Sequence, residues 1–205
     1  MTLNNCKIIG LTGGISTGKS TVSNILVGMG YALIDADKTA REVVEINKPA
    51  YLKIVEEFGK DILLVDKSID RKALGSIIFN DEKAREKLNN IIHPYIFQAI
   101  KDNLLELCKN NLNVFLDIPL LFEEYHLWGK YGIRFHEIWL VYIDKDTQIK
   151  RLMKRDNISK EEALKKIESQ MDTNHKKTLS SKIIDNSGDM KCLKEQVDKL
   201  LLELV

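Results

Sequence analysis

The stretch Gly13-Gly14-Ile15-Ser16-Thr17-Gly18-Lys19-Ser20 satisfies the pattern G-x-x-x-x-G-K-[ST]. An apolar run typical of a strand precedes it, and a helical pattern over residues 21–29 follows it. Glycines let such a loop wrap closely, so that successive N–H groups converge on phosphate oxygens, and the positive end of the helix dipole adds to the same field. Motif and context together predict a nucleotide-binding phosphate loop.

Two side chains of this loop have distinct expected roles. Lys19 is expected to reach the β- and γ-phosphates, and the Ser20 hydroxyl is expected to ligate Mg²⁺. The residues predicted to bind the nucleotide here are Gly14, Ile15, Ser16, Thr17, Gly18, Lys19, Ser20 and Thr21. ATP and Mg²⁺ are therefore the expected cofactors.

Five short apolar runs alternate with longer helical patterns. They are nearly continuous rather than alternating, as expected when helices cover both faces of a parallel sheet. The runs cover residues 7–11, 32–34, 114–118, 138–143 and 183–184. With the phosphate loop they predict a P-loop NTPase fold, a three-layer α/β/α arrangement around a five-stranded parallel sheet.

The spacing of these runs predicts how the chain is organised. Residues 1–48, 111–145 and 180–205 form the expected core, residues 49–110 a helical insertion, and residues 146–179 a lid. In the insertion, Ser68 or Asp70 starts one helix, Asn80 or Asp81 starts the next, and Pro94 is expected to begin a third. In the lid, the sequence from Ser159 to Glu162 is a capping box, which predicts a helix running toward Gln170.

Acidic residues follow two of the predicted strands. Asp35 and Asp37 come at the carboxyl end of the second strand, where open α/β sheets place their ligands. Either carboxylate is able to orient an acceptor hydroxyl, take its proton or hold Mg²⁺, although one of them alternatively caps the following helix. Asp117 ends the third strand and fits a Walker B acid that reaches the metal.

A basic helix is predicted after the fourth strand. Arg151 and Arg155 lie four residues apart, on one face of that helix. Arginines on a closing lid suit a kinase, because phosphoryl transfer needs positive charge around the moving group. The alternative is an ordinary solvated helical face.

Three further aromatic positions have two interpretations each. His93 either contacts substrate phosphate or serves as a structural hydrogen-bonding group at a helix junction. Trp128 and Trp139 are interpreted as core residues rather than substrate-stacking ones.

Composition narrows the class of protein. The chain has 205 residues, of which 44% are hydrophobic and 30% charged, with a formal net charge of +1. The small net charge argues against nonspecific nucleic-acid binding. No run approaches the ~18 apolar residues that cross a bilayer, and no leader pattern begins the chain. We expect a cytoplasmic protein with no nucleic-acid or membrane partner, as a monomer or weak homo-oligomer.

The cysteines are Cys6, Cys108 and Cys192. Their number is odd, they are widely spaced, and none forms a CxxC pair. Neither a disulfide framework nor a zinc site is indicated. We therefore expect three reduced thiols.

Ordered blocks along nearly the whole chain resemble the dephospho-coenzyme A kinase family. The blocks are Gly10 to Ile15 continuing into Gly18 to Thr21, Ile34 to Asp37 with Ala40 to Val44, His93-Pro94, Asp117 to Glu123, Gln148 with Arg151 to Arg155, Ser169 to Met171, and Ile184 to Gly188. The resemblance implies ATP-dependent phosphorylation of the ribose 3′-hydroxyl of dephospho-coenzyme A, the last step of coenzyme A synthesis. It also implies sheet order 2-3-1-4-5, a helical acceptor-binding domain and a lid.

The resemblance also implies roles for single residues. Asp37 is the expected catalytic carboxylate, acting with Lys19 and with Arg151 of the lid. The expected substrate-binding residues are Asp37, Arg41, His93 and Leu120. Asn186 is expected near the adenine of ATP, and Ser20 with Asp117 forms the expected metal site.

Two positions depart from the family pattern. Ser16-Thr17 stands where the family usually has Gly-Ser, and we expect an outward-pointing side chain there to be tolerated. Lys166 stands where an arginine is expected, and the two differ at bidentate phosphate contacts. Residues 125–135 also form a slightly long segment.

Two rival functions stay open at this stage. Another small-molecule or nucleotide kinase would keep every phosphate argument and change the acceptor. A regulatory protein that hydrolyses ATP slowly would show an ATPase activity indifferent to the acceptor.

Overall fold

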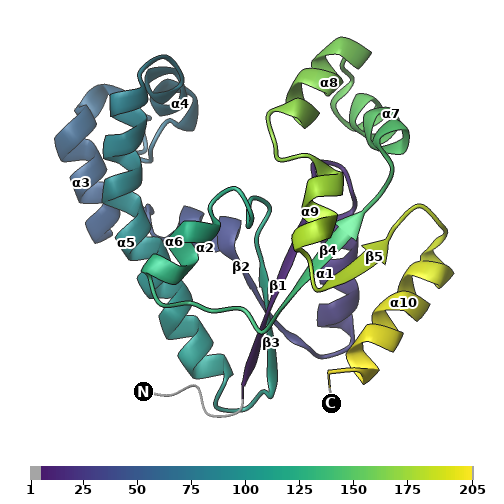
Figure 1. The fold of residues 1–205 in the computed structure, drawn as a ribbon. Helices are drawn as coiled ribbons and strands as arrows, with labels where there is room; N and C mark the ends of the chain where they lie inside the picture. The colour runs from purple at the N-terminus through teal and green to yellow at the C-terminus, as the bar shows by residue number, and fades with distance from the viewer. Residues whose placement is uncertain (1–5, 205) are drawn as a thin grey trace. The chain divides into compact units, whose positions relative to one another are not determined.

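The computed structural model describes residues 6–204, which contain a five-stranded sheet (Figure 1). The strands are β1 (Lys7–Gly13), β2 (Ala32–Asp35), β3 (Asn113–Asp117), β4 (Glu137–Tyr142) and β5 (Lys182–Asp185). They are ordered β2-β3-β1-β4-β5, and β1 pairs in parallel with both β3 and β4, as β4 does with β5. The predicted sheet order is confirmed.

Helices occupy most of the sequence between the strands. They are α1 (Lys19–Gly28), α2 (Ala36–Glu42), α3 (Pro49–Phe58), the 3₁₀ turn η1 (Lys60–Ile62), α4 (Arg71–Asn80), α5 (Glu82–Leu107), α6 (Tyr125–Lys130), α7 (Lys145–Asp156), α8 (Lys160–Glu168), α9 (Thr173–Leu179) and α10 (Met190–Leu202). The predicted starts hold: Asp70 caps α4, and Ser159 with Glu162 forms the capping box of α8. Asp81 likewise accepts hydrogen bonds from the first turn of α5.

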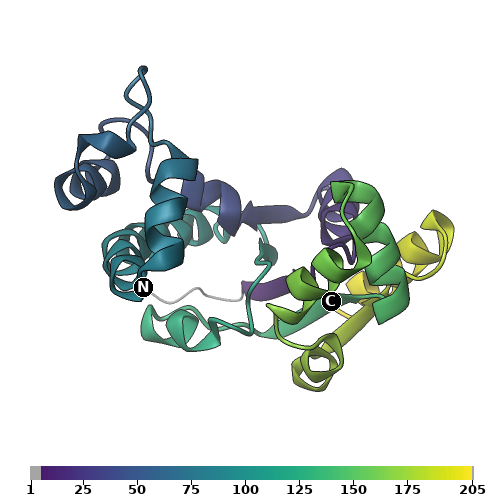
Figure 2. The ribbon, with the colours of Figure 1, turned by 90° about the horizontal axis from the view of Figure 1, so that it is seen from above.

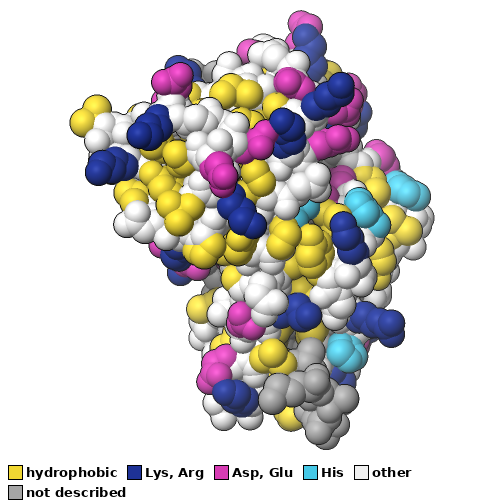
Figure 3. Space-filling view, turned by 90° about the vertical axis from the view of Figure 1, so that its left-hand side faces the viewer, with side chains coloured by type: hydrophobic (Ala, Val, Ile, Leu, Met, Phe, Trp, Pro, Cys, Tyr) yellow, Lys and Arg dark blue, Asp and Glu magenta, His cyan; other side chains and the backbone are white. Residues whose placement is uncertain are grey.

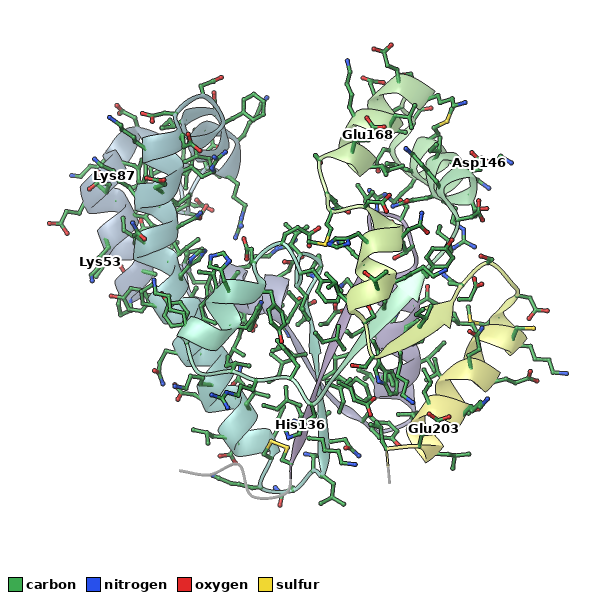
Figure 4. The ribbon with its side chains drawn as sticks, in the orientation of Figure 1. Lys53, Lys87, His136, Asp146, Glu168 and Glu203 are labelled. Atoms are coloured by element: carbon green, nitrogen blue, oxygen red, sulfur yellow. A yellow bond between two sulfur atoms is a disulfide. The ribbon has the colours of Figure 1, made fainter. Side chains whose placement is uncertain are left out.

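The chain divides into two compact units. The sheet unit comprises the residues up to Ile34 together with those from Leu105 onward, and the helical unit comprises Asp35–Leu104. The helical unit has its own core, in which Ile54, Ile62, Leu74 and Leu88 are buried together. Lys87 adds an ion pair to Glu57 at 2.6 Å on its surface (Figure 4).

The two faces of the sheet are covered by different helices. Trp139 and Val141 of β4 lie in the same cluster as the buried side chains of α1 and α10. Tyr142, which alternates to the other face, lies against Lys177 of α9, whose ammonium is 4.0 Å from the ring centroid. Figure 2 shows α1 and α9 on opposite sides of β4, so the sheet unit has the predicted three layers.

The segment 125–135 folds as α6 and the turn after it. Trp128 of α6 is buried and packs edge-on against Phe135, with ring centroids 5.5 Å apart. Phe135 in turn lies against Gly10 of β1, where an added Cβ would come within 3.1 Å of the ring. Trp139 is fully buried, so the prediction that both tryptophans are core residues is confirmed.

The expectation that Pro94 begins a new helix is wrong. Helix α5 runs unbroken from Glu82 to Leu107 with Pro94 inside it. A proline removes one N–H and so leaves one intrahelical bond unmade, to the carbonyl of Asn90. Buried residues on both sides of it, including Leu88 and Phe97, hold the two halves in one helix.

The expectation of three reduced thiols is also wrong, because Cys6 and Cys108 form a disulfide. Cys6 directly precedes β1, and Cys108 directly follows α5, with their Cα atoms 5.5 Å apart (Figure 4). The Lys7 N–H donates to the carbonyl of Leu112 at 2.7 Å and holds the two segments side by side. Spacing in the sequence gave no signal, since the two cysteines are 102 positions apart.

Replacing Cys6 and Cys108 together with serine is expected to lower the free energy of unfolding by about 2–5 kcal/mol. The bond closes a long loop in the unfolded chain, which contains the phosphate loop and the whole helical unit. Denaturant unfolding with and without a reducing agent measures the effect. Cys192→Ser is the control, because Cys192 is exposed and free. Three titratable thiols in the native, unreduced protein would contradict this prediction.

The surface carries no single dominant charge on the face shown in Figure 3. Lys and Arg side chains are interspersed there with Asp and Glu, in keeping with the net charge of +1. Among residues 6–204, no helix has both the length and the apolar character needed to cross a membrane.

Candidate active site

A pocket of about 520 Å³ surrounds the phosphate loop in the sheet unit. Its lining comprises Gly13, Gly14, Ile15, Ser16, Thr17, Gly18, Lys19, Ser20, Thr21, Pro119, Arg151, Arg155, Gln170 and Asn186. All eight loop residues predicted to bind nucleotide therefore line one cavity. Arg151 and Asn186, predicted from distant parts of the chain, line it with them.

The loop conformation explains the glycine before Lys19. Gly18 has φ of 90° and precedes the first residue of α1. A Cβ at this position would lie 2.1 Å from Nδ2 of Asn186. Only glycine combines that backbone conformation with so close a contact.

Lys19 is held by a buried acid. Its ammonium is paired with Oδ1 of Asp117, while the Ser23 hydroxyl donates to Oδ2 of Asp117 at 2.6 Å. Asp117 is only 5% exposed and ends β3 next to the loop. The structure thus brings a cation and the predicted Walker B acid together beneath the loop.

Two glutamines that were not predicted as site residues hold the backbone N–H and carbonyl of one loop residue, Ile15. The Ile15 N–H donates to Oε1 of Gln170 at 2.8 Å, and Nε2 of Gln148 donates to the Ile15 carbonyl, also at 2.8 Å. Gln148 is near the start of α7, and Gln170 follows α8. Two positions of the predicted lid segment, one near its start and one just after α8, are therefore bonded to the phosphate loop.

Arg151 and Asn186 are linked to each other and to the loop. Nη2 of Arg151 donates to the Asn186 carbonyl at 3.0 Å, and Nδ2 of Asn186 donates to the Thr17 carbonyl at 2.8 Å. Asn186 directly follows β5 and is buried. These bonds fix an arginine at the wall of the pocket.

Arg155 and Lys166, two other cations of the predicted lid segment, share one carboxylate. Arg155 donates from Nε to Oδ1 of Asp156 at 2.8 Å, and Lys166 donates to Oδ2 of Asp156, also at 2.8 Å. Two hydrogen bonds hold the pKa of Asp156 well below its usual range. The bond from Arg155 has the larger effect, and the bond from Lys166 has the next largest. Lys166 of α8 is therefore linked to α7 through Asp156. A single ion pair of this kind needs one positive charge, which lysine supplies.

None of the residues predicted for the acceptor is among those that line this pocket. Asp37 and Arg41 are exposed in the first and last turns of α2, one helical turn apart. Asp35, rather than Asp37, caps this helix, since its side chain accepts from the Lys38 N–H. His93 is half-buried in α5, edge-on to Phe97. Leu120, 38% exposed, follows β3 beside Pro119 of the pocket.

The expectation of an outward-pointing side chain at Ser16-Thr17 is wrong. Thr17 is fully buried, and its hydroxyl donates to the Gly14 carbonyl at 2.9 Å. Ser16 is half-buried. It has φ of 59°, in the left-handed region, and its hydroxyl oxygen is buried with no hydrogen-bond partner among the described residues. A left-handed conformation costs most non-glycine residues about 1–2 kcal/mol. The loop therefore carries strain at the position where the resembled family usually has glycine.

Ser16→Gly is expected to raise the free energy of unfolding by on the order of 1 kcal/mol in the absence of nucleotide. It relieves the left-handed backbone and removes the unsatisfied hydroxyl, and these gains exceed the entropy that glycine adds to the unfolded chain. Denaturant unfolding measures the change. Asn157→Gly is the matched control, because exposed Asn157 is also left-handed but is a residue type that tolerates this conformation. A Ser16→Gly variant with a lower free energy of unfolding than wild type would contradict the inference that the backbone is strained at Ser16.

Comparison with known proteins gives consistent matches. A family model described as dephospho-CoA kinase matches residues 7–191. A dephospho-CoA kinase of Carboxydothermus hydrogenoformans is 44% identical over 95% of this chain and 92% of its own, and one of Oceanobacillus iheyensis is 45% identical over 95% and 96%. Among solved structures, a dephospho-CoA kinase from Campylobacter jejuni has a TM-score of 0.71 at 33% identity, covering 96% of both chains. A Thermus thermophilus protein has a TM-score of 0.81 at 29% identity, covering 98% of both.

Proposed function

Because the chain belongs to the dephospho-CoA kinase family, we propose that it transfers the γ-phosphoryl group of ATP to the ribose 3′-hydroxyl of dephospho-coenzyme A. The products are coenzyme A and ADP, and the reaction is the final step of coenzyme A synthesis. The observation that carries the proposal is the pocket in which the phosphate loop, Lys19 and Arg151 meet.

In the proposed mechanism, the sheet unit holds the triphosphate. Loop N–H groups and the N-terminus of α1 bind phosphate oxygens, and the Lys19 ammonium moves from Asp117 to the β- and γ-phosphates. Arg151 and Arg155 line the same pocket and supply charge to the transferring group. Asn186, bonded to the loop through Thr17, lies beside the adenine in this proposal.

Three of the residues proposed to bind the acceptor belong to the helical unit, and Leu120 belongs to the sheet unit. Asp37 accepts the proton of the incoming hydroxyl, while Arg41, His93 and Leu120 contact the rest of dephospho-coenzyme A. Asp37 and Arg41 share one face of α2, so an acid and a cation are presented together. Residues 49–110 act as the acceptor-binding insertion and residues 146–179 as the lid.

Mg²⁺ fits the donor set at the loop. Mg²⁺ is usually bound by one or two protein oxygens together with phosphates and water, and it supplies neutralisation of phosphate charge. The Ser20 hydroxyl is exposed in the first turn of α1 and provides one oxygen. Asp117, engaged by Lys19 and Ser23, would supply a second oxygen for the ion. No group of three acidic, His or Cys side chains forms an all-protein metal site among residues 6–204.

A coupled assay of ADP release, with and without dephospho-coenzyme A, tests the proposed function. We expect release to require the acceptor, and the product mass to rise by one phosphoryl group. ADP release at an equal rate without acceptor would favour a slow regulatory ATPase. Transfer only to other hydroxyl compounds in a panel would favour a different small-molecule kinase.

The setting of the protein is part of the proposal. We propose a cytoplasmic enzyme that acts as a monomer or weak homo-oligomer and binds neither nucleic acid nor membrane. Its partners are then ATP and one small-molecule acceptor.

A further inference from the structure

Lys176 is a fully buried lysine, and lysine is almost never fully buried unless it is paired. It lies in α9 with a side chain that is 0% exposed, and its ammonium is 2.7 Å from Oε1 of Glu123. Glu123 follows β3 and is itself mostly buried, at 21% exposed. Nothing in the proposed transfer of a phosphoryl group uses either residue.

The same carboxylate oxygen has a second partner. The Met171 N–H donates to Oε1 of Glu123 at 3.0 Å. Met171 directly follows Gln170, whose Oε1 accepts from the Ile15 N–H of the phosphate loop at 2.8 Å. A continuous set of contacts thus runs from the buried Lys176–Glu123 pair, through the backbone of Met171, to the loop.

We propose that Glu123 is a positioning residue for the phosphate loop, acting through Met171 and Gln170 on the backbone N–H of Ile15. This inference rests on the proposed function only in that the loop binds ATP. Lys176 holds the carboxylate in place, and the carboxylate fixes the backbone from which Gln170 extends. Gln148 holds the carbonyl of the same residue, so the N–H and the carbonyl of Ile15 are both fixed before nucleotide binds.

The burial of this region explains why the hydrogen-bond acceptor for the Met171 N–H is a charged side chain, Glu123. The Glu123 and Lys176 side chains are 21% and 0% exposed, and burial also raises the pKa of the neighbouring Glu124. In such surroundings a charged acceptor makes a stronger bond to an N–H than a neutral one does. A buried ion pair adds little net stability compared with apolar residues of similar size. We therefore assign the Lys176–Glu123 pair a role in positioning the backbone at Met171.

The experiment compares two double variants that both lack the buried charges. In Glu123→Gln with Lys176→Met, the amide carbonyl still accepts from the Met171 N–H. In Glu123→Ala with Lys176→Met, no acceptor is left. ATP binding is measured by calorimetry at low temperature without acceptor substrate, after unfolding curves establish that each variant is folded.

We expect the Gln variant to bind ATP within about twofold of wild type and the Ala variant to bind about fivefold more weakly, the effect of one hydrogen bond. Gln170→Ala should weaken binding to a similar degree. Combined with the Ala double variant it should cause no further loss, because both changes break one connected set of contacts.

Two controls keep the result specific. Glu195→Gln with Lys191→Met removes an exposed ion pair of α10, outside the proposed lid, and should leave ATP affinity unchanged. If the Ala double variant does not fold, Glu123→Asp, which shortens the acceptor while keeping both charges, should show the same loss.

Wild-type affinity in the Ala variant or in Gln170→Ala would overturn the proposal, and so would fully additive losses in the combined variant. These outcomes are separate from the failure of the proposed function. If wild type binds ATP but does not phosphorylate dephospho-coenzyme A, the acceptor assignment fails while the ATP-binding comparison still decides the role of Glu123.

Discussion

Lys19→Ala is expected to lower kcat about 1000-fold. Lys19 lines the pocket and its ammonium is paired with Asp117, and removing a single preorganised charge from a transition state costs about 10²–10³-fold or more. Steady-state kinetics with ATP and dephospho-coenzyme A measures the loss. A variant that keeps a tenth of wild-type kcat would contradict the role given to Lys19.

Loss of turnover through unfolding has to be separated from loss of chemistry. Lys19→Ala also leaves the buried carboxylate of Asp117 without its cation, which costs about 3–5 kcal/mol. The double variant Lys19→Ala with Asp117→Asn removes that charge, and its amide oxygen still accepts from Ser23. We expect the double variant to recover much of the stability and none of the turnover.

Much of the fold could be predicted because its signals are local. The phosphate loop is contiguous in sequence, and each parallel strand appears as an apolar run bounded by polar residues. Helix starts were equally local, since Asp70 and Ser159 bond to N–H groups two or three positions further on. The prediction of a helix start at Pro94 failed because it used only the local helix-breaking preference of proline. The packing of α5 against distant residues outweighs that preference.

The parts of the site that sequence did not reveal depend on contacts between distant residues. Gln148 and Gln170 were visible in the chain, but their bonds to Ile15 exist only once the lid segment returns to the loop. The Cys6–Cys108 bond is of the same kind. Ser16 could be recognised as unusual from the family pattern. Its left-handed backbone and the burial of its hydroxyl could not be predicted, because both depend on how the folded loop is packed.

Asp37→Asn is expected to lower kcat by about 10²–10⁴-fold, the usual contribution of general base catalysis, while ATP affinity changes by less than about twofold. The amide keeps the size of the side chain and its place in the first turn of α2, but it is unable to take a proton from the acceptor hydroxyl. Separate measurements of kcat and of the Kd for ATP distinguish this loss from a loss of binding.

Asp35→Asn provides the matched control for this variant. It is the same chemical change two residues earlier, at the residue that caps α2 through the Lys38 N–H. Asparagine caps helices about as well as aspartate, so both the stability and kcat of this control should stay near wild type. An Asp37→Asn variant that retained comparable kcat would show that the acceptor proton leaves by another route. Equal losses in both variants would mean that the effect comes from removing negative charge near α2, because Asp35 lies outside the proposed proton transfer.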